Sequence, residues 1–100
     1  MKYGLEKHII DNITAIFANY SQVEKVVIYG SRAKGNFRPN SDIDLTFIGN
    51  EVDVSLLNDI SWALDDLLLP HKFDLSVFRN ISQDDLLEHI KRVGMVFYQK

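Results

Sequence analysis

The sequence of 100 residues contains no cysteine and no long apolar run. Without cysteine, disulfide bonds and thiolate metal sites are excluded, so any metal ion must be bound by oxygen or histidine ligands. No apolar run approaches the roughly 18 to 20 residues that a membrane span requires. The N-terminus also lacks the charged-then-apolar arrangement of a signal peptide. We therefore expect an intracellular, cytoplasmic protein without membrane contact.

An excess of basic charge is also missing. The formal net charge is −3, which argues against a surface that binds nucleic acid regardless of sequence. Basic and aromatic residues are not interleaved on one face either, so no direct nucleic-acid partner is expected. What is present is 46% hydrophobic and 25% charged residues in periodic runs, without repeat, linker or low-complexity segment. One domain over residues 1–100 is predicted, because two cores would each be too small.

Apolar residues follow helical spacing in three parts of the chain. The first helix is predicted over about residues 3–20. A second is predicted over about residues 53–69, with Asp53 or Ser55 as its N-cap and a proline just after its end. A third, over residues 82–94, begins in a stretch that resembles a capping box and ends at a glycine.

Strand patterns lie between these helices. Residues 26–29 are β-branched and aromatic and stop at a glycine, which predicts a buried central strand. Residues 42–48 and 72–78 alternate between polar and apolar, and residues 95–98 can add a short edge strand. Residues 31–41 form a loop with room for one helical turn. The pattern therefore predicts helices that pack on a small sheet.

Carboxylates gather on the polar faces of two of these strands. Residues two apart on a strand point to the same face, so Asp42 and Asp44 project side by side, and Asp74 lies on the matching face of residues 72–78. Such carboxylates repel each other, and a bound divalent cation commonly relieves the repulsion. Three of them can share two Mg²⁺ ions roughly 3.5 to 4 Å apart, as in nucleotidyl transfer. The alternative is an exposed strand face without function.

A glycine-containing turn precedes the carboxylates. Gly30 lets a backbone approach a ligand closely, and backbone amides with the Ser31 hydroxyl could bind a phosphate if a helical turn begins there. Arg32, Lys34 and Arg38 lie in the same loop and would offset polyphosphate charge. The alternative interpretation is an ordinary turn followed by a solvated basic loop.

Together these segments resemble a known signature. Gly30-Ser31-Arg32-Ala33-Lys34-Gly35, followed after five residues by Ser41-Asp42-Ile43-Asp44-Leu45, looks like the nucleotidyltransferase motif of the DNA polymerase β superfamily. At this length the chain is similar to the minimal nucleotidyltransferase group over nearly all its residues. The resemblance implies an α+β fold, with a small mixed β-sheet flanked by helices.

The same resemblance implies roles for particular residues. The metal ligands and catalytic residues would be Asp42, Asp44 and Asp74. Nucleotide would be bound by Gly30, Ser31, Arg32, Lys34, Gly35 and Ser41. Lys34 stands where many relatives carry arginine, which can alter a phosphate contact but not the metal site. The implied cofactors are two Mg²⁺ ions, with ATP as the nucleotide donor.

Minimal nucleotidyltransferases are often encoded beside a HEPN-domain protein, and the pair looks like a toxin–antitoxin system in which the antitoxin adenylylates a tyrosine of the toxin. By resemblance, we expect transfer of a nucleoside monophosphate, AMP from ATP, to a hydroxyl of such a partner. A chain of this length has no room for its own acceptor-binding domain, so the acceptor should come from elsewhere. The alternative function is a non-catalytic binding module that neutralises its partner by occlusion.

The remaining candidates carry weaker signals. His8, His71 and His89 have no metal-type spacing, so ordinary surface or edge positions are expected for all three. Trp62 interrupts a leucine-rich helix, and Leu67-Leu68-Leu69 exceeds what one helix face needs. An exposed tryptophan beside these leucines could anchor a partner protein or a second copy of the chain.

Overall fold

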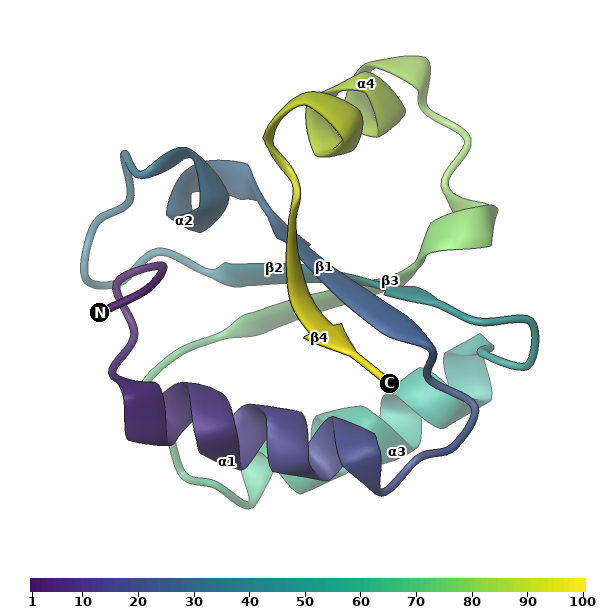
Figure 1. Cartoon of the computed structure of the whole chain (residues 1–100), viewed down its shortest axis with the longest axis horizontal. Coiled ribbons are helices and arrows are strands. Elements are labelled where there is room, and N and C mark those ends of the chain that lie inside the picture. The colour runs from purple at the N-terminus through teal and green to yellow at the C-terminus, as the bar shows by residue number, and fades with distance from the viewer.

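A single mixed β-sheet organises the chain in the computed structural model, which describes residues 1–100 (Figure 1). Its strands are β1 (Lys25–Tyr29), β2 (Ile43–Ile48), β3 (Phe73–Val77) and β4 (Met95–Gln99). Their order in the sheet is β3-β2-β1-β4. Strand β1 runs antiparallel to β2 and β4, whereas β2 and β3 are parallel. The sheet is therefore mixed, as the resemblance implied.

Helices lie on both sides of this sheet. They are α1 (Lys7–Ala18), α2 (Gly30–Lys34), α3 (Val54–Asp65) and α4 (Asp84–Val93), with a 3₁₀ turn η1 (Phe78–Asn80) after β3. Helices α1 and α3 contact each other and cover one face, whereas α2 and α4 meet on the opposite side (Figure 1). Because β2 and β3 are parallel, a crossover must join them, and α3 supplies it.

The core lies between the sheet and the α1–α3 layer. The predicted alternation of β2 is confirmed, because Ile43, Leu45 and Phe47 are fully buried. Phe17 of α1 packs edge-on against Phe47, with 5.2 Å between ring centroids. The register of β1 with β4 shifts between Val26 and Val27, and the rings of both Phe97 and Tyr98 of β4 contact the Phe17 ring. The opposite face, which carries Asp44, is covered in part by α2 and α4, and Thr46 on it is fully buried.

Two helices are shorter than their apolar patterns predict. Helix α1 begins at Lys7 rather than near residue 3, because Tyr3 has a left-handed φ of 57° and residues 2 and 5 form an isolated β-bridge. Helix α3 ends at Asp65, before the proline at position 70, and Leu68 then adopts a φ of 55°. In both cases the helical spacing of apolar residues extends beyond the end of the helix itself. No helix is both long enough and apolar enough to cross a membrane.

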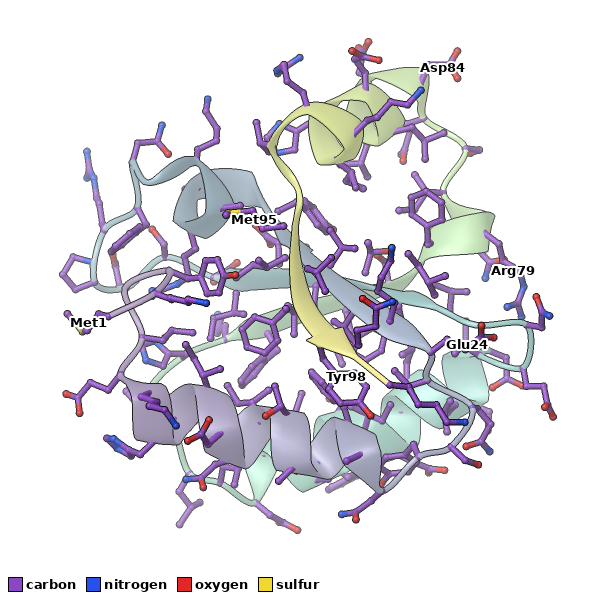
Figure 2. The ribbon with its side chains drawn as sticks, viewed as in Figure 1. Met1, Glu24, Arg79, Asp84, Met95 and Tyr98 are labelled. Atoms are coloured by element: carbon purple, nitrogen blue, oxygen red, sulfur yellow. The ribbon has the colours of Figure 1, made fainter.

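The predicted capping box of α4 is wrong. The N-cap residue is Gln83, and no side chain caps the helix through a hydrogen bond. Acidic Asp84 and Asp85 in the first turn, with basic Lys91 and Arg92 in the last, instead complement the helix dipole. Asp84 projects outward at the start of the helix (Figure 2).

Of the two N-cap residues predicted for α3, Asp53 and Ser55, the structure shows Asp53 in that position. Its Oδ1 accepts a hydrogen bond of 2.8 Å from the Leu56 amide. Asp53→Ala should lower the free energy of unfolding by about 1 kcal/mol, because an amide at the helix start loses its partner. Asp53→Asn, which keeps an acceptor oxygen, is the matched control. Urea unfolding of the three proteins tests this, and equal midpoints for wild type and Asp53→Ala would contradict it.

Candidate active site

The sheet register brings two of the three predicted carboxylates together. In the parallel pairing of β2 with β3, Asp44 lies directly beside Asp74, and in the antiparallel pairing of β1 with β2 it lies beside Tyr29. Asp42 lies just before β2 and is exposed. The three acidic residues therefore come from two neighbouring strands at one end of the sheet.

Their charges affect one another most at Asp44. Burial, followed by the negative charges of Asp74 and Asp42, raises the pKa of Asp44 to about 6. Ionising this carboxyl group is costly unless a cation lies nearby. Asp44 is the partly buried member of the group, whereas Asp42 and Asp74 are exposed.

Oxygen donors of this kind suit Mg²⁺, which typically takes one or two protein carboxylates and completes its coordination with phosphate oxygens and water. No three Asp, Glu or His side chains are arranged closely enough to hold a metal ion by themselves. The chemistry of the donors and the raised pKa of Asp44 thus fit a divalent cation that is bound together with a triphosphate. They do not fit an all-protein cage.

Gly30 faces this cluster from the first residue of α2. It has a φ of 75°, and a β carbon at this position would collide with the Asp44 carboxylate. Its amide donates a hydrogen bond of 3.1 Å to Nε2 of His89 on α4. The short helix α2 therefore starts directly after β1, with a bare backbone against Asp44.

Gly30→Ala should cost more stability than Gly35→Ala. Both glycines have a positive φ, which costs a residue with a side chain roughly 1 to 2 kcal/mol. A β carbon at Gly35 would meet no atom within 4 Å, whereas at Gly30 it would displace Asp44. Urea unfolding without nucleotide measures the difference. Equal losses for the two variants would show that the contact with Asp44 has no cost.

Arg32 does not fit its predicted role as a phosphate ligand. Its side chain is almost completely buried, with 2% of its surface exposed, and burial lowers the pKa of its guanidinium group. Nε donates to the Ser41 carbonyl at 3.1 Å, Nη1 to the Tyr3 carbonyl at 2.8 Å and Nη2 to the Pro39 carbonyl at 3.3 Å. The guanidinium also lies 5.3 Å from the Phe37 ring centroid. Arg32 therefore fastens the loop that leads to Asp42.

The other predicted nucleotide-binding residues divide into two groups. The Ser41 hydroxyl accepts a hydrogen bond of 2.8 Å from the Arg38 amide, so it stabilises its own loop. Gly35 is the C-cap of α2, with a φ of 90°. Ser31, in the first turn of α2, is partly exposed, and Lys34 at the end of α2 is exposed. Of these four, Lys34 has the most exposed side chain, and the hydroxyl groups of Ser31 and Ser41 can still donate a hydrogen bond.

Two histidines for which the sequence predicted ordinary surface or edge positions contact residues of the site. Besides binding the Gly30 amide, His89 packs its ring edge-on against Tyr29, with 6.2 Å between centroids. His71 Nδ1 lies 3.5 Å from Nη2 of Arg32, and burial, then the Arg32 charge, lowers the pKa of His71. The contact between His89 and Gly30 spans 59 residues, so no local sequence pattern could reveal it.

A cleft of about 540 Å³ opens beside Asp74, between α3, β3 and the start of α4. The Ser76 hydroxyl in its lining is buried without a hydrogen-bond partner. Burial raises the pKa of Tyr29, which also lines the cleft, and the charges of Asp74 and Asp44 add to this shift. The cleft thus joins polar groups to the acidic end of the sheet.

The glycine turn at the start of α2 thus lies against the paired carboxylates of β2 and β3. The model of the family described as Polymerase beta, Nucleotidyltransferase matches residues 11–100. The chain therefore belongs to this nucleotidyltransferase family, whose members generally use a nucleoside triphosphate and a divalent metal ion. Among curated proteins, none matches the chain.

Solved structures share the fold. A chain of a toxin–antitoxin crystal structure with AMP-PNP is 21% identical, with a TM-score of 0.72 over 96% of this chain and 75% of that one. A chain from the complex of the tri-AMPylated Shewanella oneidensis HEPN toxin with MNT antitoxin is 16% identical. Its TM-score is 0.69, over 96% of this chain and 74% of that one. A chain of the toxin–antitoxin MntA-HepT is 18% identical, with a TM-score of 0.68 over 95% and 74%. These likenesses confirm the predicted polymerase β-like fold.

Proposed function

We propose that this chain is a Mg²⁺-dependent nucleotidyltransferase that moves AMP from ATP to a tyrosine hydroxyl of a HEPN-type partner protein, and that it acts as the partner's antitoxin. The observation that carries the proposal is the pairing of Asp44 with Asp74 beside the bare α carbon of Gly30. Similar structures, among them a toxin–antitoxin with AMP-PNP and a tri-AMPylated HEPN toxin in complex with MNT antitoxin, support the choice of nucleotide and partner.

The acidic residues would hold the metal. Asp42, Asp44 and Asp74 supply carboxylate oxygens for two Mg²⁺ ions, and the triphosphate and water supply the remaining ligands. When bound, Mg²⁺ neutralises phosphate charge and lowers the pKa of the attacking hydroxyl. This explains why the fold tolerates a carboxyl group such as Asp44, whose pKa is about 6 in the metal-free state.

The turn would hold the phosphates. Because Gly30 has no side chain, the backbone at the start of α2 lies directly against the Asp44 carboxylate, so a triphosphate bound with the metal would lie beside this turn. The Ser31 hydroxyl would donate a hydrogen bond to the triphosphate, and exposed Lys34 would offset its charge. Arg32 would contribute indirectly, through the loop that places Asp42.

Asp74 would activate the acceptor. It is exposed and borders the cleft, so an incoming tyrosine can reach its carboxylate. The tyrosine oxygen attacks the α-phosphorus of ATP and its proton passes to Asp74. A new phosphorus–oxygen bond forms as the bond to pyrophosphate breaks, and pyrophosphate leaves.

Two exposed apolar side chains, one on α3 and one just after it, support docking of a partner. Trp62 of α3 is 72% exposed and Leu68, in the turn after α3, is 89% exposed. These side chains lose apolar contact with water only when another protein covers them. The covering protein would be the HEPN-type partner or a second copy of the chain.

Incubation with ATP labelled at the α-phosphate, Mg²⁺ and the protein encoded beside this chain tests the function. We expect label on a tyrosine of that protein, and Asp42→Ala should reduce transfer at least ~10²-fold, because an electrostatic ligand at the reacting phosphate is lost. Asp59→Asn, an exposed position on α3, is the matched control. Undiminished transfer by Asp42→Ala would contradict the catalytic assignment.

The same assay separates catalysis from occlusion. If the partner is bound and inhibited without label, and if Asp42→Ala with Asp44→Ala leaves both properties intact, the chain is a binding module. Inhibition that requires ATP and both aspartates supports the enzyme.

A further inference from the structure

Helix α4 delivers one side chain to the glycine turn. His89 is partly buried, and its Nε2 accepts the Gly30 amide hydrogen at 3.1 Å. Its ring also stands nearly perpendicular to the Tyr29 ring, at an angle of 80°. The peptide between Tyr29 and Gly30 is therefore held by a residue from a distant part of the chain.

The hydrogen bond defines the state of the imidazole. A ring nitrogen that accepts an N–H bond carries no proton, so in this arrangement the proton of neutral His89 is on Nδ1. The side chain acts on Gly30 as a hydrogen-bond acceptor rather than as a cation.

Two constraints meet at Gly30. On one side its amide points to His89, and on the other its α carbon lies against Asp44. Rotation of the peptide before Gly30 would break the bond to His89 and move the backbone relative to the Asp44 carboxylate. The orientation of the first turn of α2, which includes Ser31, therefore depends on the bond from α4.

We propose that His89 is a positioning residue for the triphosphate: its Nε2 fixes the Gly30 peptide so that the start of α2 presents Ser31 and its backbone to the phosphates. This inference rests on the proposed function, because it assigns His89 to the phosphate side of the same site. His89 acts through Gly30 and does not touch the reacting atoms. Its loss should therefore raise the KM for ATP and leave kcat nearly unchanged.

Two variants of His89 separate the acceptor from the ring. His89→Gln keeps a hydrogen-bond acceptor at a similar reach but removes the ring, whereas His89→Phe keeps an aromatic ring against Tyr29 but has no acceptor. We expect His89→Phe to raise the KM for ATP about tenfold, as for one lost hydrogen bond, with kcat within about twofold of wild type. His89→Gln should stay within about threefold in KM. Glu88→Gln, exposed on the same helix, is the control and should match wild type.

The reverse order, with His89→Gln impaired and His89→Phe normal, would overturn the proposal, because packing on Tyr29 would then be the role of the ring. Equal KM values in all three proteins, or equal impairment of both variants, would also overturn it.

Hydrogen exchange of the Gly30 amide, measured by NMR on the protein without nucleotide, gives a second readout that needs no activity. We expect exchange about tenfold faster in His89→Phe, since the amide loses its acceptor, and near wild-type exchange in His89→Gln. Unchanged exchange in His89→Phe overturns the inference. If wild type transfers no label but Gly30 exchanges faster only in His89→Phe, the proposed function is wrong. The hydrogen bond from Gly30 to His89 is then still supported.

Discussion

Replacing Asp44 by Asn should abolish nucleotidyl transfer and, in the absence of metal, make the protein more stable at neutral pH. Transfer should fall by at least ~10²-fold, because the side chain loses the charge that binds the metal. Stability should rise because Asn is isosteric and neutral, so the cost of burying a charge and the repulsion from Asp74 and Asp42 both disappear. A catalytic residue that destabilises its own fold is expected to show both effects.

The pH dependence follows from the direction of the shift. The pKa of Asp44 is about 6 in the folded protein, against 3.8 as its ordinary value. Between these two values the folded state binds more protons than the unfolded state, so the stability of wild type falls as pH rises through this window. The loss is complete about one unit above the folded pKa, and amounts to about 1 to 2 kcal/mol after allowance for solvent screening of a partly exposed group.

Urea unfolding of metal-free protein at pH 5 and pH 7.5 tests this. The gain in stability of Asp44→Asn over wild type should be larger at pH 7.5, and Mg²⁺ with a non-hydrolysable ATP analogue should stabilise wild type only. Asp59→Asn is the control, because its side chain is exposed on α3. Parallel pH profiles for wild type and Asp44→Asn would refute the assigned cost of ionising Asp44.

The strands and the acidic face could be predicted because both depend on local patterns. Alternation along residues 42–48 and 72–78 identified the buried and polar faces of β2 and β3. Alternation also placed Asp74 on the matching polar face, but the direct pairing of Asp44 with Asp74 depends on strand order and register, which alternation does not specify. Fold and family were therefore accessible from the sequence, whereas the contacts between elements were not.

Two differences between the predicted and observed surroundings of site residues share one physical cause. A basic residue in a glycine-containing loop looks like a phosphate ligand, yet Arg32 folds inward because carbonyls from two separate segments of the chain converge on it. His89 looked like an ordinary surface histidine because its partner is far away in sequence. In both cases the tertiary fold decides which donors and acceptors meet, and composition or spacing does not record that.

Arg32→Lys should be among the most destabilising single changes in the site, although it conserves the charge. The guanidinium binds the carbonyls of Ser41, Tyr3 and Pro39 in three directions. A lysine ammonium cannot reproduce this planar fork, so at least one buried carbonyl loses its donor. The free energy of unfolding should fall by about 2 to 4 kcal/mol.

The position of Arg32 also predicts which part of the protein Arg32→Lys should destabilise. Since the side chain fastens the loop before Asp42, Arg32→Lys should lower stability without nucleotide and expose residues 35–41 to proteolysis. Arg38→Lys, an exposed change in the same loop, should alter the free energy of unfolding by less than about 0.5 kcal/mol. If Arg32→Lys unfolded like wild type but had a raised KM for ATP, Arg32 would be a phosphate ligand after all, and the loop-fastening role would be wrong.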